Sequence, residues 1–457
     1  MDIRSARESR VTALSDAHPT PTEAHVDFAA ESVSTGTIAV IGLGYVGLPL
    51  AILAESRGHR VVGFDIDKIK IALLQGRNAP FLSNEESRAF RKSRMRLSSD
   101  ERILDEALTH IICVPTPVNE EHVPDLAPLV GACTAVGRHL KKGALVVIES
   151  TVNPGVCESV ALPILERESG LVCEKDFSFA HCPERVNPGD ATWTTRTLPR
   201  VIGGAGPTSN ARAILLYESL IDASVTPMNS MKEAEAVKMV ENAFRDINIA
   251  FVNELAMSFD KADIDIMHVI RGASTKPFAF MPHFPGCGVG GHCIPVDPYY
   301  LIRYGKENGF EHRFLIAARQ INNEMPRYTV NRLEQLLRRK NMPLKGAAVA
   351  LLGLAYKRDV PDLRESPALA IETELNRGGA QVRKFDPFVP EQSTAHSLEE
   401  ALSGANAAVI ATDHSVFRSL SPKDFLSHGV RVLIDGRNCL PKEEFVASGI
   451  AYHGIGR

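Results

Sequence analysis

A short apolar segment that ends in spaced glycines constrains the fold of this chain more than any other feature. Residues 38–41 read IAVI and lead into Gly42-Leu-Gly44-Tyr-Val-Gly47, which a helix-like stretch follows. In this context Gly42 permits a tight turn, Gly44 lets the backbone approach a pyrophosphate, and Gly47 allows close packing of helix against strand. The helix N-terminus would add unpaired N–H groups and a partial positive charge. The pattern predicts a strand–turn–helix unit that binds a dinucleotide.

An acidic residue at the end of the next apolar run indicates which dinucleotide this is. Asp65 lies 18 residues after Gly47 and closes the segment VVGFD. A carboxylate at that position suits hydrogen bonding to a ribose diol and would repel a 2′-phosphate, so NAD is favoured over NADP. The alternative is a glycine-tolerant turn that holds no ligand.

Apolar runs alternate with helix-like segments on both sides of a helical middle. Further candidate strands lie at 111–114, 144–150 and 177–182, and a second series begins at Ala347. This alternation predicts mostly parallel, doubly wound sheets. Residues 230–261 contain no Gly or Pro and predict one long helix, of a length that commonly links domains or supports a dimer interface. We expect an α/β fold of two Rossmann-like doubly wound domains joined by a central helical domain with a long helix.

The domain boundaries are expected where this pattern changes. Residues 1–35 are polar with little periodicity and predict a disordered N-terminal extension. An NAD-binding Rossmann domain is expected over 36–228 and a central helical domain over 229–342. A C-terminal α/β domain is expected over 343–457.

Composition excludes several classes of function. The chain has 457 residues, with 51 Lys and Arg against 55 Asp and Glu, so its net charge of -4 gives no global basic field for nucleic acid or an anionic membrane. Aromatic residues make up only 6%, with one Trp, which disfavours a base-stacking surface. No run approaches the ~18 apolar residues of a membrane span, and the start lacks the apolar core of a signal peptide. We therefore expect a cytoplasmic protein.

A second glycine cluster precedes a candidate reactive cysteine. Four glycines fall within 286–291, a density that no helix or strand favours, so we interpret the segment as a loop whose backbone closely approaches something. Cys293 follows directly and Asp297 lies four residues on, so a thiol could reach a substrate carbon beside a carboxylate that handles protons. Spacing alone leaves Cys287, inside the same loop, as a rival. The eight cysteines form no C-x-x-C pair, and we expect reduced thiols and no metal site.

Other polar side chains could support chemistry at this cysteine. Lys238, Asn242 and Arg245 fall at helical spacing and share one helix face, where a Lys–Asn pair could stabilise an oxyanion. The alternative for them is a solvated stripe. Residues 149–151 (EST) end a predicted strand, which is where open α/β sheets bind ligands. Residues 183–185 (PER) follow another predicted strand, and their alternative is a simple turn.

With these segments in place, the chain resembles the UDP-glucose/GDP-mannose dehydrogenase family from about residue 37 to 445. The matching motifs are GLGYVGLPLA (42–51), VPTP (114–117), ESTVNPG (149–155), CPERVNPG (182–189), ENAFRDINIAFVNE (241–254), GVGGHCIPVDPYYL (288–301) and LGLAYKRDVPDLRESP (352–367). The resemblance implies an N-terminal NAD domain, a helical dimerisation middle that carries the cysteine loop, and a C-terminal UDP-sugar-binding domain. It also implies a reaction, in which the C6 hydroxymethyl group of a nucleotide sugar is oxidised to a carboxylate in two hydride transfers, each to NAD+.

The resemblance further implies roles for individual residues. Cys293 falls on the family's nucleophile, which forms a thiohemiacetal with the C6 aldehyde and then a thioester that water hydrolyses. The supporting catalytic residues are Lys238 and Asn242 for oxyanions, Asp297 for water, and Thr151 with Glu184 for protons. The cofactor contacts are Gly42, Gly44, Tyr45, Val46, Gly47, Asp65, Pro115, Thr116 and Thr151. The substrate contacts are Glu184, Arg185, Lys238, Asn242, Arg245, Gly290, and the basic residues Lys357 and Arg437, which suit a diphosphate.

The residue after the Pro-Glu pair resembles that of one branch of the family. Arg185 stands where UDP-glucose enzymes carry an apolar residue, and the segments 193–204 and 274–280 resemble the UDP-N-acetylglucosamine 6-dehydrogenases of surface-polysaccharide synthesis. UDP-N-acetylglucosamine is the expected substrate, with UDP-N-acetylmannosamine and UDP-glucose as alternatives. A two-electron hydroxy-acid dehydrogenase and a non-enzymatic sensor are more remote. We expect a homodimer with no nucleic-acid or membrane partner. The chain departs from the family at Cys287, where Pro is usual, and in residues 1–35, which have no counterpart.

Overall fold

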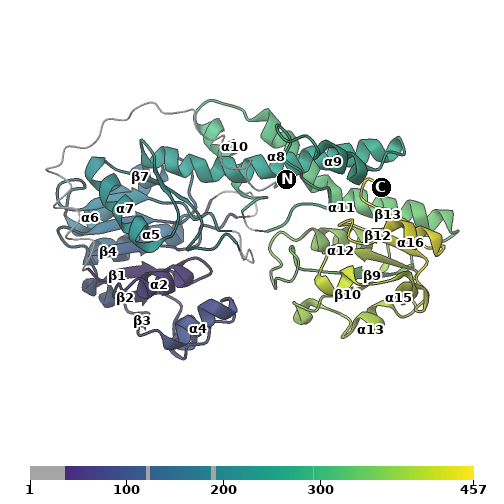
Figure 1. Cartoon of the computed structure of the whole chain (residues 1–457), viewed down its shortest axis with the longest axis horizontal. Helices are drawn as coiled ribbons and strands as arrows, with labels where there is room; N and C mark the ends of the chain where they lie inside the picture. The colour runs from purple at the N-terminus through teal and green to yellow at the C-terminus, as the bar shows by residue number, and fades with distance from the viewer. Residues whose placement is uncertain (1–35, 120–123, 187–191, 292) are drawn as a thin grey trace, which may run out of the picture.

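Two α/β units lie side by side and are joined along one edge by long helices (Figure 1). The computed structural model describes residues 36–119, 124–186, 192–291 and 293–457. The expected N-terminal extension, 1–35, lies outside the described residues. The predicted fold class, two doubly wound α/β units with helices between them, is confirmed by the two sheets, of which the first is mostly and the second wholly parallel.

The N-terminal unit is built on an eight-stranded sheet with the order β3-β2-β1-β4-β5-β6-β7-β8. The strands are β1 (Ile38–Ile41), β2 (Val61–Phe64), β3 (Arg96–Ser98), β4 (Thr109–Ile112), β5 (Leu145–Ile148), β6 (Ser178–His181), β7 (Arg200–Gly204) and β8 (Val225–Pro227). All neighbours pair in parallel except β6 and β7, which are antiparallel. The strand order reverses between β1 and β4, and ligands of doubly wound sheets bind at such a switch point.

Alternate residues of each strand face opposite sides of this sheet, and both sides are apolar. Helices therefore cover both faces. They are α2 (Gly47–Ser56), α3 (Lys68–Gln75), α4 (Asn84–Lys92), α5 (Ala127–His139), α6 (Leu162–Ser169) and α7 (Pro207–Leu220), with short helical turns at Glu101–Glu106 and Cys157–Ala161. In β1, Ile38 and Val40 pack into one core cluster and Ala39 and Ile41 into the other. This alternation of wholly apolar strands produces two buried layers.

The helical middle consists of α8 (Met231–Lys261), α9 (Ile266–Ala273), α10 (Asp297–Glu307) and α11 (Arg313–Arg339). The predicted long helix is confirmed, and it begins where the Ser230 side chain accepts a hydrogen bond from the Glu233 N–H. Its 31 residues span about 47 Å at the rise of an α-helix. α8 runs from beside β7 toward the C-terminal unit, where it packs on α11 (Figure 1). One rigid helix therefore contacts both units.

The C-terminal unit has a five-stranded parallel sheet with the order β10-β9-β11-β12-β13. Its strands are β9 (Ala348–Leu352), β10 (Gln381–Phe385), β11 (Ala407–Ile410), β12 (Val432–Asp435) and β13 (Ala451–Gly454). Its helices are α12 (Pro367–Arg377), α13 (Leu398–Leu402), α14 (Ser415–Arg418), α15 (Pro422–Leu426) and α16 (Lys442–Ala447), with a 3-10 turn at Pro390–Gln392. Among the described residues, no helix is both long and apolar enough to cross a membrane.

Candidate active site

The first glycine turn has the shape that a pyrophosphate requires. Gly42 has φ +89°, and a Cβ there would lie 2.8 Å from the Cys113 carbonyl oxygen. A Cβ on Gly47 would lie 1.9 Å from the Gly42 carbonyl oxygen, so helix and strand are in contact at this point. Around Gly44, in contrast, a Cβ would meet no described atom within 4 Å, and no described side chain caps the N-terminus of α2. Open space at Gly44 beside uncapped N–H groups fits a dinucleotide phosphate.

The Asp65 side chain stabilises the same turn through a hydrogen bond to its backbone. Its carboxylate is buried and accepts hydrogen bonds from the Leu43 N–H (2.9 Å) and the Asp67 N–H (3.0 Å). The Lys70 ammonium forms an ion pair with it at 2.8 Å. The ribose contact stays a prediction, because these partners already engage both carboxylate oxygens. Sequence reasoning missed Lys70, whose spacing of five residues from Asp65 was the available signal.

We expect Gly44→Val to weaken NAD binding without destabilising the free protein. The added side chain enters open space in the folded chain but would occupy the position of the phosphate. The dissociation constant for NAD should rise at least about tenfold, or about 1.4 kcal/mol, when measured by calorimetry. Gly42→Ala is the matched control, because its Cβ would clash with the Cys113 carbonyl and should lower the melting temperature even without NAD. Unchanged NAD affinity in Gly44→Val would remove this turn from the cofactor site.

The predicted cofactor loops after β4 and β5 are tied to each other. The Thr116 hydroxyl donates to the Thr151 carbonyl (2.6 Å), and the Tyr300 hydroxyl of α10 donates to the Thr116 carbonyl (2.8 Å). Because β4 lies next to β1, these loops reach the same edge of the sheet as the glycine turn. Pro115 is exposed on this edge, and Tyr45 is exposed as well, with its ring against Phe81.

Four predicted catalytic residues come together where α8 meets α10. The Asn242 amide donates to the Asp297 carboxylate at 2.6 Å, and the Asp297 N–H donates to the Cys293 carbonyl at 2.8 Å. Lys238 lies one turn from Asn242 on α8 and is only 8% exposed, which argues against a solvated stripe at this position. The structure therefore places a thiol, an ammonium group, an amide and a carboxylate at one point.

The electrostatics of this cluster keep the Cys293 thiol protonated at rest beside a carboxylate that can accept its proton. Burial raises the pKa of Asp297 to about 6, while Lys238 and the Asn242 hydrogen bond oppose the rise. Burial and the neighbouring Asp297 also raise the pKa of the Cys293 thiol, and Lys238 opposes that rise. The Asp297 carboxylate titrates near neutral pH beside the protonated Cys293 thiol, so it can accept a proton and give it back.

Glu184 and Arg185 are both held by partners that sequence reasoning did not find. The Glu184 carboxylate accepts the backbone N–H groups of Arg185 and Val186, both at 2.6 Å, and pairs with Arg200 at 3.0 Å. Burial opposes ionisation of Glu184, but Arg200, the Val186 N–H and Lys238 together outweigh burial, so the pKa of Glu184 is lowered. The Arg185 guanidinium pairs with Glu241 of α8. An arginine at the start of the otherwise apolar strand RVIGG was the available signal for Arg200.

The second glycine cluster approaches the C-terminal unit. A Cβ on Gly286 would lie 3.0 Å from the Arg437 guanidinium, and one on Gly290 would lie 2.6 Å from Tyr356. The Gly291 N–H donates to the Arg364 carbonyl at 2.9 Å. The close approach that the sequence predicts is therefore a contact between chain segments. It places Cys293, just beyond the loop, against the 354–366 segment of the C-terminal unit.

Cys287 occupies a different environment from Cys293. It is buried in a hydrophobic cluster of the C-terminal unit, and its thiol donates to the Ala411 carbonyl at 3.4 Å. Burial raises the pKa of Cys287 to about 11, so the thiol stays protonated. Cys287 anchors the loop, which disfavours it as a nucleophile.

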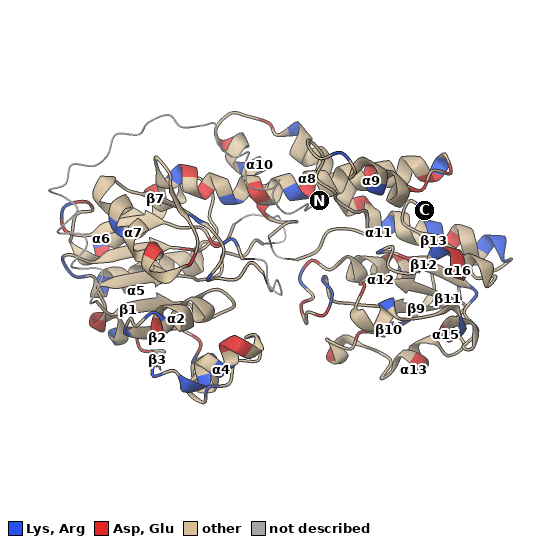
Figure 2. Cartoon of the chain, in the orientation of Figure 1, with Lys and Arg blue, Asp and Glu red and all other residues tan. Residues whose placement is uncertain are grey.

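Basic residues surround the contact between the loop and the C-terminal unit. Lys357 follows β9, Arg437 follows β12, and Arg437 lies 3.6 Å from the Asp413 carboxylate. Arg245 of α8 and Arg364 both oppose the burial-driven rise in the pKa of Tyr356, so their charges face the same loop. Elsewhere both signs of charge are scattered over the two units (Figure 2). Arg437, Arg245 and Arg364 therefore lie at the contact between the loop and the C-terminal unit.

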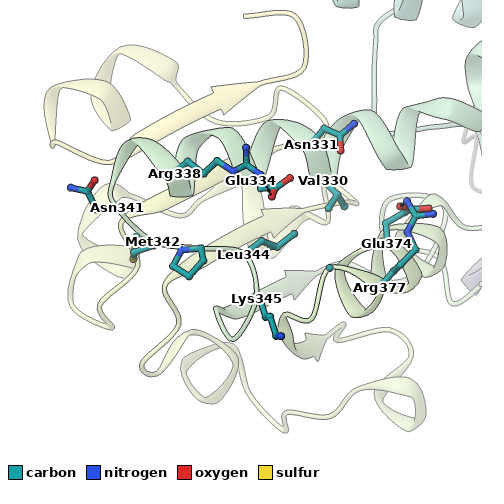
Figure 3. Close-up of a pocket in the computed structure, with 12 residues that line it drawn as sticks. Val330, Asn331, Glu334, Arg338, Asn341, Met342, Leu344, Lys345, Glu374 and Arg377 are labelled. Carbon is teal, nitrogen blue, oxygen red and sulfur yellow. Dashed lines mark hydrogen bonds and ion pairs between the residues drawn. The ribbon is translucent and has the colours of Figure 1, made fainter.

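A separate cavity of about 490 Å³ lies at the carboxyl end of α11 (Figure 3). Arg338, Met342, Lys345 and Arg377 are among the residues that line it, and none of the predicted site residues does. The described part of the chain also contains no cluster of His, Cys, Asp and Glu that could hold a metal ion. The cavity is therefore distinct from the candidate active site.

Comparison with known proteins extends these observations. Residues 36–221, 232–324 and 350–442 match the NAD-binding, central and UDP-binding domains of the UDP-glucose/GDP-mannose dehydrogenase family. The chain is 37% identical to UDP-N-acetyl-D-glucosamine 6-dehydrogenase from Pseudomonas aeruginosa, over 89% of this chain and 98% of that protein. It is 39% identical to UDP-N-acetyl-D-mannosamine dehydrogenase from Pyrococcus horikoshii, over 92% and 99%. A solved structure of a UDP-D-ManNAc dehydrogenase from Pyrococcus horikoshii superposes with a TM-score of 0.87 at 37% identity, covering 92% of this chain and 99% of that one.

Proposed function

The chain belongs to the UDP-glucose/GDP-mannose dehydrogenase family, and from that premise we propose that it oxidises C6 of UDP-N-acetylglucosamine to a carboxylate. Family membership makes it an NAD-dependent UDP-sugar dehydrogenase. The observation that carries the proposal is the junction of Cys293, Asp297, Lys238 and Asn242 at the contact between the units. The product would supply surface-polysaccharide synthesis.

The four-electron reaction requires a covalent step, which Cys293 supplies. The first glycine turn would hold NAD+, which would supply the acceptor for the hydride removed in each of the two oxidations. The Cys293 thiolate adds to the C6 aldehyde, and the resulting thiohemiacetal loses a hydride and a proton to become a thioester. Water then attacks the thioester carbon, the C–S bond breaks, and the thiolate is regenerated with a carboxylate product. Covalent capture keeps the aldehyde from escaping between the two oxidations.

The neighbouring side chains have separate tasks in this scheme. Lys238 and Asn242 donate to the oxygen that becomes negative at C6, since Asn242 contacts Asp297 and the charge of Lys238 acts on the Cys293 thiol. Asp297 accepts the proton of the attacking water. Glu184, ionised by Arg200, and Thr151 handle protons at C6. Lys357 and Arg437 hold the diphosphate.

An N-acetylated sugar is favoured by relatives and by one side chain. The relatives described above are named for UDP-N-acetyl-D-glucosamine and UDP-N-acetyl-D-mannosamine. Arg185, which pairs with Glu241, lies on the loop that also holds Glu184. We propose that this loop contacts the N-acetyl group. Because Glu241 already pairs with its guanidinium, Arg185 would then define the shape of the pocket and would not be the main hydrogen-bond donor to the sugar.

A panel of nucleotide sugars tests both the substrate and the number of electrons removed. Purified protein should form two NADH per UDP-N-acetylglucosamine consumed, with smaller kcat/KM for UDP-N-acetylmannosamine and UDP-glucose. NADH is read by absorbance and the sugar products by mass spectrometry. One NADH per sugar, with aldehyde accumulating, would sink the four-electron scheme. Preference for another UDP-sugar at two NADH each would overturn the substrate alone.

We also propose that two copies associate along α8. Val240, Phe244 and Phe251 are apolar, more than 45% exposed, and spaced so that they share one face of the helix. An apolar stripe of this kind on a long helix favours a partner helix. A second copy of the chain is the partner we expect.

A further inference from the structure

A fully buried arginine lies behind the predicted active site and bridges two carboxylates. Arg200, the first residue of β7, has no exposed surface. Its guanidinium lies 3.0 Å from the Glu184 carboxylate and 3.9 Å from the Glu149 carboxylate. Sequence analysis singled out the segment that contains Glu149, but none of the catalytic steps proposed above uses this side chain. One cation and two acids therefore share a buried site.

The two carboxylates are held in different ways. Two backbone N–H groups donate to one Glu184 oxygen, and the other oxygen forms an ion pair with Arg200 at 3.0 Å that is not a hydrogen bond among the described residues. Glu149 accepts a hydrogen bond from the Tyr217 hydroxyl of α7 on one oxygen. Its second oxygen is buried without a hydrogen-bond partner among the described residues. The environment thus stabilises a charge on Glu184 better than a charge on Glu149.

Several further groups face this pair from the surrounding elements. The thiols of Cys113 and Cys182, after β4 and β6, lie near Glu149, and Lys238 of α8 faces Glu184. Burial raises the pKa of Glu149 to about 7, Arg200 opposes the rise and Glu184 adds to it. With Glu149 protonated, the cluster of Glu149, Glu184 and Arg200 is neutral. With Glu149 ionised, it carries one buried negative charge.

We propose that Glu149 is the second member of a buried carboxylate pair that sets the basicity of Glu184, with Arg200 as the positioning residue that holds the pair together. When Glu149 loses its proton, like-charge repulsion increases the affinity of Glu184 for a proton, and Glu184 becomes a stronger base toward the sugar. The proposal rests on the role at C6 given to Glu184 above. Glu149 and Arg200 act through Glu184 and do not themselves touch the sugar.

The pH dependence of kcat tests this arrangement. In the unaltered enzyme, kcat should rise with pH through a transition near 7, because the deprotonated pair contains the stronger base. Glu149→Gln fixes the neutral state, so the rise should be lost and kcat at pH 8.5 should fall about tenfold, with KM for the UDP-sugar changed less than about twofold. Tyr217→Phe removes a donor that favours the charged form of Glu149, so the transition should move to higher pH. Asp297 is intact in all these variants, so a transition lost only in Glu149→Gln belongs to the pair.

Arginine variants separate positioning from stability. Arg200→Lys keeps the charge but not the bridge, and we expect kcat to fall at least about tenfold with an altered pH profile. Arg212→Lys is the matched control, because Arg212 is also buried but donates to the Gly143 and Ala144 carbonyls, which precede β5, whereas Glu149 follows β5. It should lower the melting temperature and leave the pH profile unchanged.

Two results would overturn the proposal: a transition near pH 7 that persists in Glu149→Gln, or equal changes of profile in Arg200→Lys and Arg212→Lys. The profiles are measured with whichever UDP-sugar the enzyme oxidises fastest. An error in the proposed substrate or in the NADH stoichiometry would therefore appear in the unaltered enzyme and would not be mistaken for failure of the pair.

Discussion

Cys293→Ala should abolish carboxylate formation, lowering turnover by roughly 10⁴-fold or more, the scale on which loss of a covalent nucleophile is felt. Without the thiol no thiohemiacetal forms, so the second hydride has no donor. Binding of the UDP-sugar should change little, because the basic groups proposed to hold its diphosphate lie on other segments, at Lys357 and Arg437. Turnover is measured as carboxylate formed per enzyme by mass spectrometry, and binding by calorimetry with the UDP-sugar alone.

Cys287→Ala is the matched control for the nucleophile. Its thiol is buried in the C-terminal cluster and donates to the Ala411 carbonyl, so its removal should cost about 1–2 kcal/mol of stability and leave most of the activity. An inactive Cys287→Ala beside an active Cys293→Ala would reverse the assignment of the nucleophile. The two cysteines are only six residues apart in sequence, but Cys287 lies in the apolar cluster of the C-terminal unit and Cys293 lies beside Asp297 and Lys238.

Local patterns made much of the fold predictable. The turn between IAVI and the helix requires a positive φ and close backbone contacts that only glycine allows, as Gly42 and Gly47 show. The long helix follows from 31 residues without Gly or Pro and from a serine cap at its start. Periods of two and 3.6 residues are properties of neighbours in sequence, so they can be read without knowing the tertiary structure.

The contacts that join distant segments were not predictable in the same way. Lys238 and Asn242 could be paired with each other from helical spacing, but not with Asp297, 55 residues later. The loop at 286–291 indicated close approach, yet only the structure identifies Tyr356 and Arg437 as its neighbours. Arg200 left still less signal, because a single buried charge at the start of a strand has no period. The role of such residues can be recognised only when the fold shows which partners they contact.

Asp297→Asn should trap the enzyme at the thioester. The buried Asp297 carboxylate, with a pKa of about 6, is ionised at pH 8 and can accept the proton of the attacking water, whereas an amide cannot. The asparagine can still accept the hydrogen bond from Asn242, so the fold should be retained. We expect kcat to fall by about 10²–10³-fold, with a rapid burst of two NADH per active site before the slow steady state.

The trapped species has a mass that can be measured directly. Denatured Asp297→Asn protein quenched after the burst should carry the nucleotide sugar as an acyl group, and the adduct should map to the peptide that contains Cys293. The double variant Cys293→Ala/Asp297→Asn should show neither the adduct nor the second NADH. A single variant that turns over slowly with no burst and no adduct would mean that Asp297 acts before the thioester, in forming the thiolate beside it. The 2.8 Å hydrogen bond between the Asp297 N–H and the Cys293 carbonyl keeps the two residues together in either case, so the burst amplitude decides between these roles.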